Sequence, residues 1–270
     1  MQRKITAMYF SATGTTAKVI MHIAGMLSVQ LAGQLHCHDF TLPAGRRETV
    51  VMSPDDIIVI GVPVYAGRVP NVLLHYLRSV VGNGARAIAV VVYGNRNYDD
   101  ALIELTDILS QDGFRVIAGG AFIGEHSFSN ILAQKRPDEN DRRVMSAFVG
   151  QIAQKVIKQG EAGTVVVAGS RPYRQYYIPR DENGRNVDIR KVKPKISSAC
   201  INCGLCAEIC PMGSINKERV GEIEGICIKC CACIKKCPVQ AKYFDDPGYI
   251  NHKRELEIEF PERKEPTFFI

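Results

Sequence analysis

The sequence contains no apolar run long enough to cross a membrane. Its longest apolar stretches, such as Ala87–Tyr93 and Val165–Ala168, have the length of a strand, whereas a membrane helix needs about 18 or more apolar residues. The first residues lack the apolar core and small-residue cleavage site of a secretion signal. These absences predict a soluble, cytoplasmic protein.

Nucleotide-binding fingerprints are missing as well. Neither G-x-G-x-x-G nor G-x-x-x-x-G-K-S/T occurs, and no catalytic dyad stands out, which argues against a dedicated enzyme. The composition is otherwise ordinary for a globular protein, with 46% hydrophobic and 23% charged residues in 270. That length allows one large domain and one small one.

Cysteine is almost absent outside one short stretch. Nine of the ten cysteines fall between Cys200 and Cys237, and only Cys37 lies elsewhere. A secreted disulfide scaffold would be short and would carry a signal peptide. Nine cysteines in 38 residues of a cytoplasmic chain are therefore interpreted as metal-binding.

The clustered cysteines form two copies of C-x2-C-x2-C-x3-C-P, one at 200–211 and one at 227–238. Three closely spaced thiols can surround one 4Fe–4S cluster, while the fourth reaches the other cluster. Cluster I is thus assigned Cys200, Cys203, Cys206 and Cys237, and cluster II is assigned Cys227, Cys230, Cys233 and Cys210. Zinc also binds paired C-x2-C motifs, but these tighter repeats, each followed by proline, are not zinc spacing. Cys231 and Cys37 are interpreted as small buried residues.

The first 160 residues alternate strand and helix patterns. The expected strands are Ile5–Phe10, Leu35–Phe40, Ile57–Val62, Ala87–Tyr93 and Phe114–Ile123. The expected helices are Thr15–Leu31, Val69–Val81, a segment with Leu102, Leu105, Ile108 and Leu109 on one side, and Asp141–Gln159. This pattern predicts an α/β fold with a doubly wound, five-stranded parallel sheet. Ligands bind such sheets beyond the carboxyl ends of the strands, here at loops 11–16, 62–70 and 93–99.

Residues 197–244 resemble bacterial-type two-cluster ferredoxins, and the whole chain resembles ferredoxins whose N-terminal region is flavodoxin-like. The segments that carry the resemblance are SATGTT, GVPVYAGRVP, VVYGNRNYDDAL, AFIGEHSFS, CGLCAEICPMGSI and DDPGYINHKRELE. It implies a flavodoxin-like domain at 1–162, a connector at 163–196, a small α+β ferredoxin domain with two 4Fe–4S clusters at 197–246 and a tail at 247–270.

The three loops also predict a flavin, most simply FMN. The segment Ser11–Thr16 places hydroxyls and backbone N–H groups at a helix start, where they could hold a phosphate or merely cap the helix. It resembles the phosphate loop of flavodoxins, with Thr15 where many have Asn. Tyr65 would stack on the flavin without a tryptophan partner, because the chain has no Trp. The expected flavin-binding residues are Ser11, Ala12, Thr13, Gly14, Thr15, Thr16, Pro63, Tyr65, Gly67, Arg68, Tyr93, Gly94, Asn95, Arg96 and Tyr98.

Two cations in these loops suggest how the flavin would react. Arg68 and Arg96 would favour the anionic, fully reduced ring, which gives the hypothesis of two-electron reduction. A strongly stabilised one-electron state in a redox titration would contradict it. After the fifth strand, His126 is interpreted as a capping histidine, with a general acid as the alternative.

The segment 164–199 is basic, with eight Lys and Arg against three Asp and Glu. It could dock an acidic redox partner. Its tyrosines and positive charge would also suit single-stranded nucleic acid, but no RNA-binding signature accompanies them.

The sequence therefore predicts an anaerobic electron carrier that passes electrons between FMN, two 4Fe–4S clusters and a redox partner protein. One alternative is an NAD(P)H- or quinone-linked flavin oxidoreductase that uses the clusters as an electron outlet. A second is a two-cluster ferredoxin whose flavodoxin-like domain binds no flavin and serves for docking.

Overall fold

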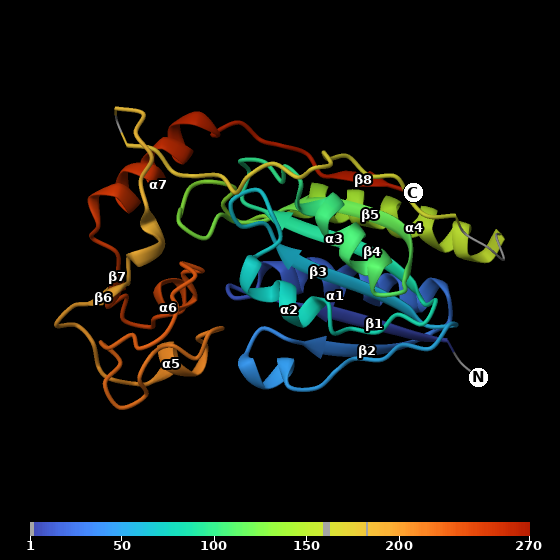
Figure 1. Ribbon diagram of the computed structural model, residues 1–270, viewed down its shortest axis with the longest axis horizontal. Coiled ribbons are helices and arrows are strands. Elements are labelled where there is room, and N and C mark those ends of the chain that lie inside the picture. The colour runs from blue at the N-terminus through green and yellow to red at the C-terminus, as the bar shows by residue number, and fades with distance from the viewer. Residues whose placement is uncertain (1–2, 159–162, 182) are drawn as a thin grey trace.

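The computed structural model describes residues 3–158, 163–181 and 183–270, and its larger part is a parallel sheet covered by helices (Figure 1). The strands of this part are β1 Lys4–Tyr9, β2 Gln34–Asp39, β3 Ile57–Pro63, β4 Arg86–Tyr93, β5 Arg115–Ile123 and β8 Thr267–Phe269. The helices are α1 Thr15–Gln30, α2 Leu74–Leu77, α3 Ala101–Gln111 and α4 Glu139–Lys158. Short 3-10 turns occupy Pro43–Arg46 and Asn71–Leu73.

The strand order is β2-β1-β3-β4-β5-β8, and the first five strands are all parallel. The order 2-1-3-4-5 is that of the flavodoxin-like doubly wound fold, so the predicted fold class is confirmed. Because the five strands run the same way, their carboxyl ends meet at one edge of the sheet.

Each face of the sheet has its own apolar core, because the strand side chains alternate between the two faces. Helices α1 and α4 cover one face, where Ile20 and Phe148 pack against strand residues such as Val59. The other face packs against α2 and α3, and Leu77 and Leu105 lie in that core.

The structure corrects the sequence interpretation at three elements. The sheet has six strands rather than five, because the chain end returns as β8 and pairs antiparallel with β5. The helix expected over Val69–Val81 is only a 3-10 turn followed by α2, because Val81 leaves the helix to form a parallel bridge with Val51. Helix α4 ends at Lys158 among the described residues, and the expected final residue Gln159 lies outside them.

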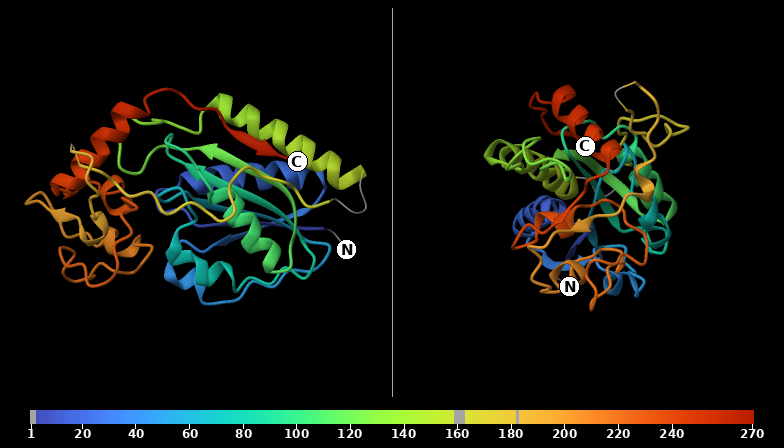
Figure 2. Two further views of the ribbon diagram at one scale, coloured as in Figure 1. Left: turned by 45° about the horizontal axis from the view of Figure 1, so that its top comes forward. Right: turned by 90° about the vertical axis from the view of Figure 1, so that its left-hand side faces the viewer.

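The cysteine-rich region contains only short elements: β6 Lys195–Ile196, α5 Leu205–Glu208, α6 Ala232–Lys235 and β7 Lys242–Tyr243. Its own core holds just three buried apolar side chains, Ala207, Ile215 and Val220, with several cysteines packed against them. So small a core is a weak source of stability, and domains of this size commonly depend on metal sites. The region lies beyond the carboxyl ends of the sheet strands (Figures 1 and 2).

The connector and the tail join the two parts. The connector crosses α3, where Arg171 pairs with Asp107 and Arg174 pairs with Asp100, and it includes a 3-10 turn at Ile189–Lys191. Helix α7, Pro247–Glu259, follows the cysteine-rich region, and the chain then runs back along the sheet to β8 (Figure 2). The tail therefore contributes to the sheet of the first domain.

None of the helices in the described part of the chain has the length and apolarity that crossing a membrane requires.

Candidate functional site

The two cysteine runs enclose two separate hollows. Hollow I is lined by Cys200, Cys203, Cys206, Cys233 and Cys237. Hollow II is lined by Cys210, Cys227, Cys230, Cys231 and Cys233. Each hollow is thus lined by thiols of both runs, and the eight assigned ligands are divided between the two hollows as the spacing predicts, with Cys233 lining both.

The two runs are also related in local geometry. The backbone N–H of Ser214 donates to Cys210 Sγ at 3.4 Å, and that of Ala241 donates to Cys237 Sγ at 3.3 Å. The donor lies four residues after the cysteine in both runs. Hydrogen bonds to ligand sulfurs are one means by which a protein sets the potential of an iron–sulfur cluster.

The chemistry of the thiols fits a bound cluster. Burial raises the pKa of Cys230 and of Cys233 to about 12, so these thiols would stay protonated unless a cation were bound. Coordinating iron would supply that charge and hold them as thiolates. Within residues 3–158, 163–181 and 183–270, no three His, Cys, Asp or Glu side chains lie close enough together to bind one metal ion directly. Thiols that are spread around a hollow suit a multi-atom cluster better than a single, four-coordinate zinc ion.

A third hollow lies at the carboxyl edge of the sheet, between the loops that follow β1, β3, β4 and β5. We call it hollow III. Eight of the predicted flavin residues line it: Ala12, Thr13, Thr15, Thr16, Pro63, Tyr65, Tyr93 and Gly94. A side chain at Gly94 would collide with the ring of His126, so glycine lets the histidine pack directly on this loop. Hydroxyls near a helix start, together with two tyrosine rings, fit the phosphate and the ring of FMN.

The other predicted flavin residues do not line hollow III. Ser11 Oγ accepts the N–H of Ala17 at 2.9 Å, and Gly14 precedes α1 in the left-handed conformation (φ 95°). Both therefore shape the start of the helix. Gly67 faces Asp99, and the ring of Tyr98 lies 5.6 Å from that of Tyr93.

The side chains of Asn95, Arg68 and Arg96 form their contacts outside hollow III. Asn95 Nδ2 donates to the carbonyls of Phe260 and Glu262, both at 2.8 Å. The guanidinium of Arg68 pairs with the buried carboxylate of Glu104 through two bonds of 2.7 Å.

Arg96 pairs with Asp99, and its guanidinium lies 4.7 Å from the ring centre of Tyr177. Arg68 and Arg96 do not line hollow III, and each of them is paired with a carboxylate. The structure therefore corrects the hypothesis that two cations border the flavin.

Sequence reasoning missed part of the lining. The additional lining residues are Val64, Val92, Gly124, Glu125, Ser127 and Cys230, together with His126, for which the sequence favours a capping role. Most of them follow β5, whose carboxyl end meets the same edge as the others, so the strand count alone could have identified that loop. No local signal pointed to Cys230, because it comes from the other end of the chain.

Comparison with known proteins supports the iron–sulfur part directly. The 4Fe-4S binding domain family matches residues 194–216, which contain the first cysteine run. No curated protein matches the chain. Among solved structures, a flavodoxin from the domain Archaea is 15% identical, with 58% of this chain and 99% of that one covered, at a TM-score of 0.40. Flavodoxin 1 from Bacillus cereus is 16% identical, with 56% of this chain and 97% of that one covered, at a TM-score of 0.42. An NADH:FMN oxidoreductase in its apo form is 16% identical, with 59% of this chain and 92% of that one covered, at a TM-score of 0.43.

The chain is a flavodoxin-like domain joined to a ferredoxin domain. The strand order establishes the flavodoxin-like part, and the family match on the cysteine run establishes the iron–sulfur part.

The ferredoxin domain packs directly on the flavodoxin-like domain. Cys230 and Ala232 belong to the same apolar core as α2 and α3, and Ile209 and Ile228 pack against it. Around this contact, Arg46 Nη2 donates to the carbonyl of Pro211 at 2.5 Å. The ferredoxin domain therefore contributes Cys230 to the wall of hollow III.

An aromatic group near hollow III connects the flavodoxin-like domain to α7 of the tail and to the connector. Phe128, after β5, lies 4.8 Å from Tyr249 and 6.2 Å from His252 of α7, measured between ring centres. His252 is also stacked on Tyr177 of the connector at 5.6 Å. Burial lowers the pKa of His252 to about 4, so this histidine is neutral at pH 7.

His126 is neutral as well. Burial, reinforced by His252 and Lys235, lowers its pKa to about 3. Its Nδ1 accepts the backbone N–H of Phe128 at 3.1 Å, so Nε2 carries the proton. The ring can therefore donate a hydrogen bond at the border of hollow III.

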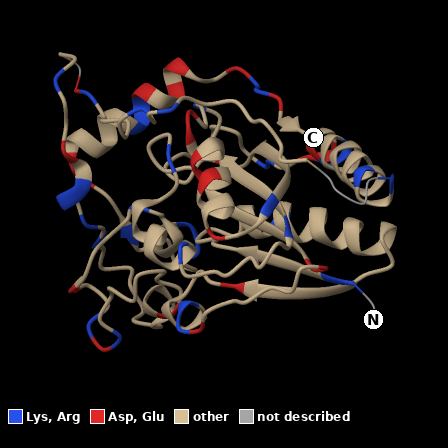
Figure 3. Ribbon diagram, turned by 45° about the vertical axis from the view of Figure 1, so that its right-hand side comes forward, with Lys and Arg blue, Asp and Glu red and all other residues tan. Residues whose placement is uncertain are grey.

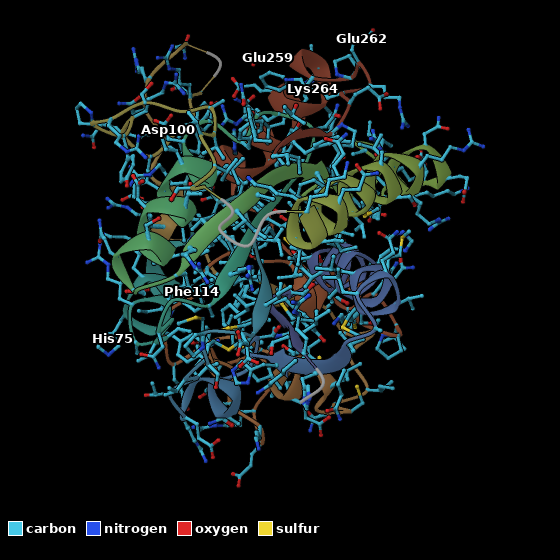
Figure 4. All side chains as sticks on the ribbon, turned by 90° about the vertical axis from the view of Figure 1, so that its right-hand side faces the viewer. His75, Asp100, Phe114, Glu259, Glu262 and Lys264 are labelled. Atoms are coloured by element: carbon cyan, nitrogen blue, oxygen red, sulfur yellow. The ribbon has the colours of Figure 1, made fainter. Side chains whose placement is uncertain are left out.

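The connector has less free positive charge than its sequence indicates. Arg171, Arg174, Arg190 and Lys195 are each paired with a carboxylate of the same chain. Asp100, labelled in Figure 4, lies under the connector and receives two bonds from Arg174.

Proposed function

We propose that this protein transfers electrons between an FMN held in hollow III and two 4Fe–4S clusters held in hollows I and II. The observation that carries the proposal is the wall shared by hollows II and III: Cys230 lines both of them. A flavin and a cluster in these positions would be neighbours within one chain.

The chain's own residues would hold the cofactors and control their surroundings. Thr13, Thr15 and Thr16 would bind the phosphate, while Tyr65 would pack against the ring. His126 would donate a hydrogen bond to it. The bound cofactors would supply the redox chemistry itself.

The redox partner belongs to the proposal too. We propose a protein partner that exchanges electrons with the ferredoxin domain. An acidic partner would meet connector cations such as Arg180, Arg185 and Lys191, which form no ion pair within the described residues.

Cofactor content tests the proposal. Protein purified without oxygen and reconstituted with iron, sulfide and FMN should contain about eight irons and about one FMN per chain. About eight irons with no retained FMN would contradict the flavin half and favour a two-cluster ferredoxin with a docking domain. About four irons would contradict the assignment of two clusters.

A threonine variant tests the location of the flavin. Thr15→Val should weaken FMN binding by roughly tenfold or more, because a hydrogen bond to a charged group contributes about 1.5–3 kcal/mol. Thr267→Val, an exposed position on β8, should leave the Kd unchanged. Equal Kd values for the wild type and Thr15→Val, measured by fluorescence titration, would place the phosphate elsewhere.

A further inference from the structure

Electrons that pass between the two domains need a short path, because tunnelling between redox centres weakens steeply with distance. Hollow II shares Cys230 with hollow III. Hollow I shares no lining residue with hollow III and shares only Cys233 with hollow II. Its thiol Cys203 is exposed, whereas Cys230 of hollow II is buried. Cluster II is thus placed on the inside and cluster I on the outside.

One side chain ties the ferredoxin domain to the loop that borders hollow III. Lys235 Nζ donates to Glu125 Oε1 at 2.5 Å and to the carbonyls of His126 and Ser129 at 2.8 and 2.9 Å. The Lys235 side chain is only 16% exposed. It satisfies three acceptors at once, which is the full capacity of an ammonium group.

Lys235 lies between two cysteines that are assigned to different clusters. It lies on α6, between Cys233 of cluster II and Cys237 of cluster I. Glu125 and His126 both line hollow III. A single lysine therefore links the cluster-binding helix to the lining of the proposed flavin site. At the matching position of the first run the sequence has Glu208, an exposed residue of opposite charge. The lysine that makes this contact is thus present in the second cysteine run and replaced by glutamate in the first.

We infer that electrons cross between the domains at Cys230 and cluster II, and that Lys235 is the positioning residue that keeps this crossing short. The inference rests on the proposed function. Each crossing moves one electron between the flavin and cluster II, with no bond formed or broken. Cluster I then exchanges that electron with cluster II and with the partner protein.

The test measures electron transfer inside the full chain, loaded with FMN and both clusters. A laser flash in the presence of a photoreductant reduces the flavin, and absorbance follows the passage of the electron to the clusters. Lys235→Met should slow this passage by an order of magnitude or more while iron, sulfide and FMN contents stay at the wild-type level. The matched control is Lys217→Met, which removes an exposed lysine of the ferredoxin domain that lines none of the three hollows and should leave the rate unchanged. A wild-type rate in Lys235→Met would overturn the role of Lys235.

A second pair of variants identifies the inner cluster without depending on Lys235. Cys203→Ser should damage cluster I and leave the fast passage from the flavin intact, whereas Cys227→Ser should damage cluster II and abolish it. The reverse pattern would overturn the inferred route. A wild-type chain that retains no FMN would contradict the proposed function itself, whereas retained FMN with the reverse pattern contradicts only the route.

Discussion

At the scale of single residues, Cys231 shows how the two cysteine runs differ. It occupies the left-handed conformation (φ 60°) at the position where the first run has Gly204 (φ 78°). Residues other than glycine pay about 1–2 kcal/mol for that conformation. The side chain is 3% exposed, and its Sγ lies 3.4 Å from Tyr249 Oη. Cys231 therefore packs against α7, although it also borders hollow II.

A pair of substitutions separates this packing role from ligation. Cys231→Ala should keep the wild-type iron and sulfide content, because four other thiols surround hollow II. Cys233→Ala should lose cluster II, since it removes one of those four. Iron and sulfide assays on both variants make the comparison. Loss of iron from Cys231→Ala would mean that this thiol is a ligand.

At the scale of elements, the end of α3 carries an unfavourable charge. Asp112 caps the carboxyl end of the helix, where the helix dipole disfavours an anion. Its Oδ2 is buried without a hydrogen-bond partner. Burial raises its pKa to about 6, with the cation of Arg78 opposing the shift. The carbonyl of Asp112 accepts the N–H of Gly82, and this bond connects the end of α3 to the loop that precedes β4.

This carboxyl makes stability depend on pH in a defined direction. Between its ordinary pKa of 3.8 and about 6, the folded chain keeps a proton that the unfolded chain releases. Stability therefore falls as the pH rises through this window and stays low above it. Asp112→Asn should raise the urea midpoint of the anaerobic protein, and more at pH 7.5 than at pH 5.

The exposed Asp55→Asn is the control for general charge effects. A gain from Asp112→Asn that is the same at both pH values would contradict the assigned cause.

At the scale of the whole molecule, the tail folds back onto the flavodoxin-like domain. Figure 3 shows Lys, Arg, Asp and Glu interspersed along α7 and the tail, and several of these charges bind the flavodoxin-like domain. Arg263 pairs with Asp138 at 2.6 Å, and Lys264 Nζ donates to the carbonyl of Arg96. The labelled Glu262 and Lys264 lie on this returning segment (Figure 4). The ferredoxin domain is thus held by the connector on one side and by the tail on the other.

Asn95 is a buried residue of the flavodoxin-like domain that binds the returning tail. It is 2% exposed, and it binds the tail through Phe260 and Glu262. Asn95→Ala should lower the local stability of residues 260–269 by about 2 kcal/mol, because it removes the hydrogen bonds that Asn95 donates to the two tail carbonyls. Hydrogen exchange should become faster there and stay unchanged in β1 and β3.

Asn97→Ala, at an exposed position two residues away, is the matched control. Wild-type exchange in the tail of Asn95→Ala would show that β8 alone holds it.

Much of this protein could be predicted from local patterns. The continuous apolar runs at β3 and β4 indicated buried parallel strands, because only a sheet covered on both faces accepts apolar residues at every position. The spacing of the cysteines predicted crossed cluster assignments, because short-range spacing determines which thiols can surround one centre.

Other features depend on contacts between distant parts of the chain, which no local pattern encodes. The carboxylates of Glu104 and Asp99 engage the cations expected beside the flavin, although Glu104 lies 36 residues from Arg68. The sixth strand forms only because the chain end returns to the free edge of β5. The wall of hollow III needs Cys230, which only domain packing brings there. The sequence by itself determined the five parallel strands and the cysteine spacing, since both depend on neighbouring residues. The tertiary structure decided which charges stay free and which cluster site adjoins the proposed flavin site, since both depend on how the domains pack.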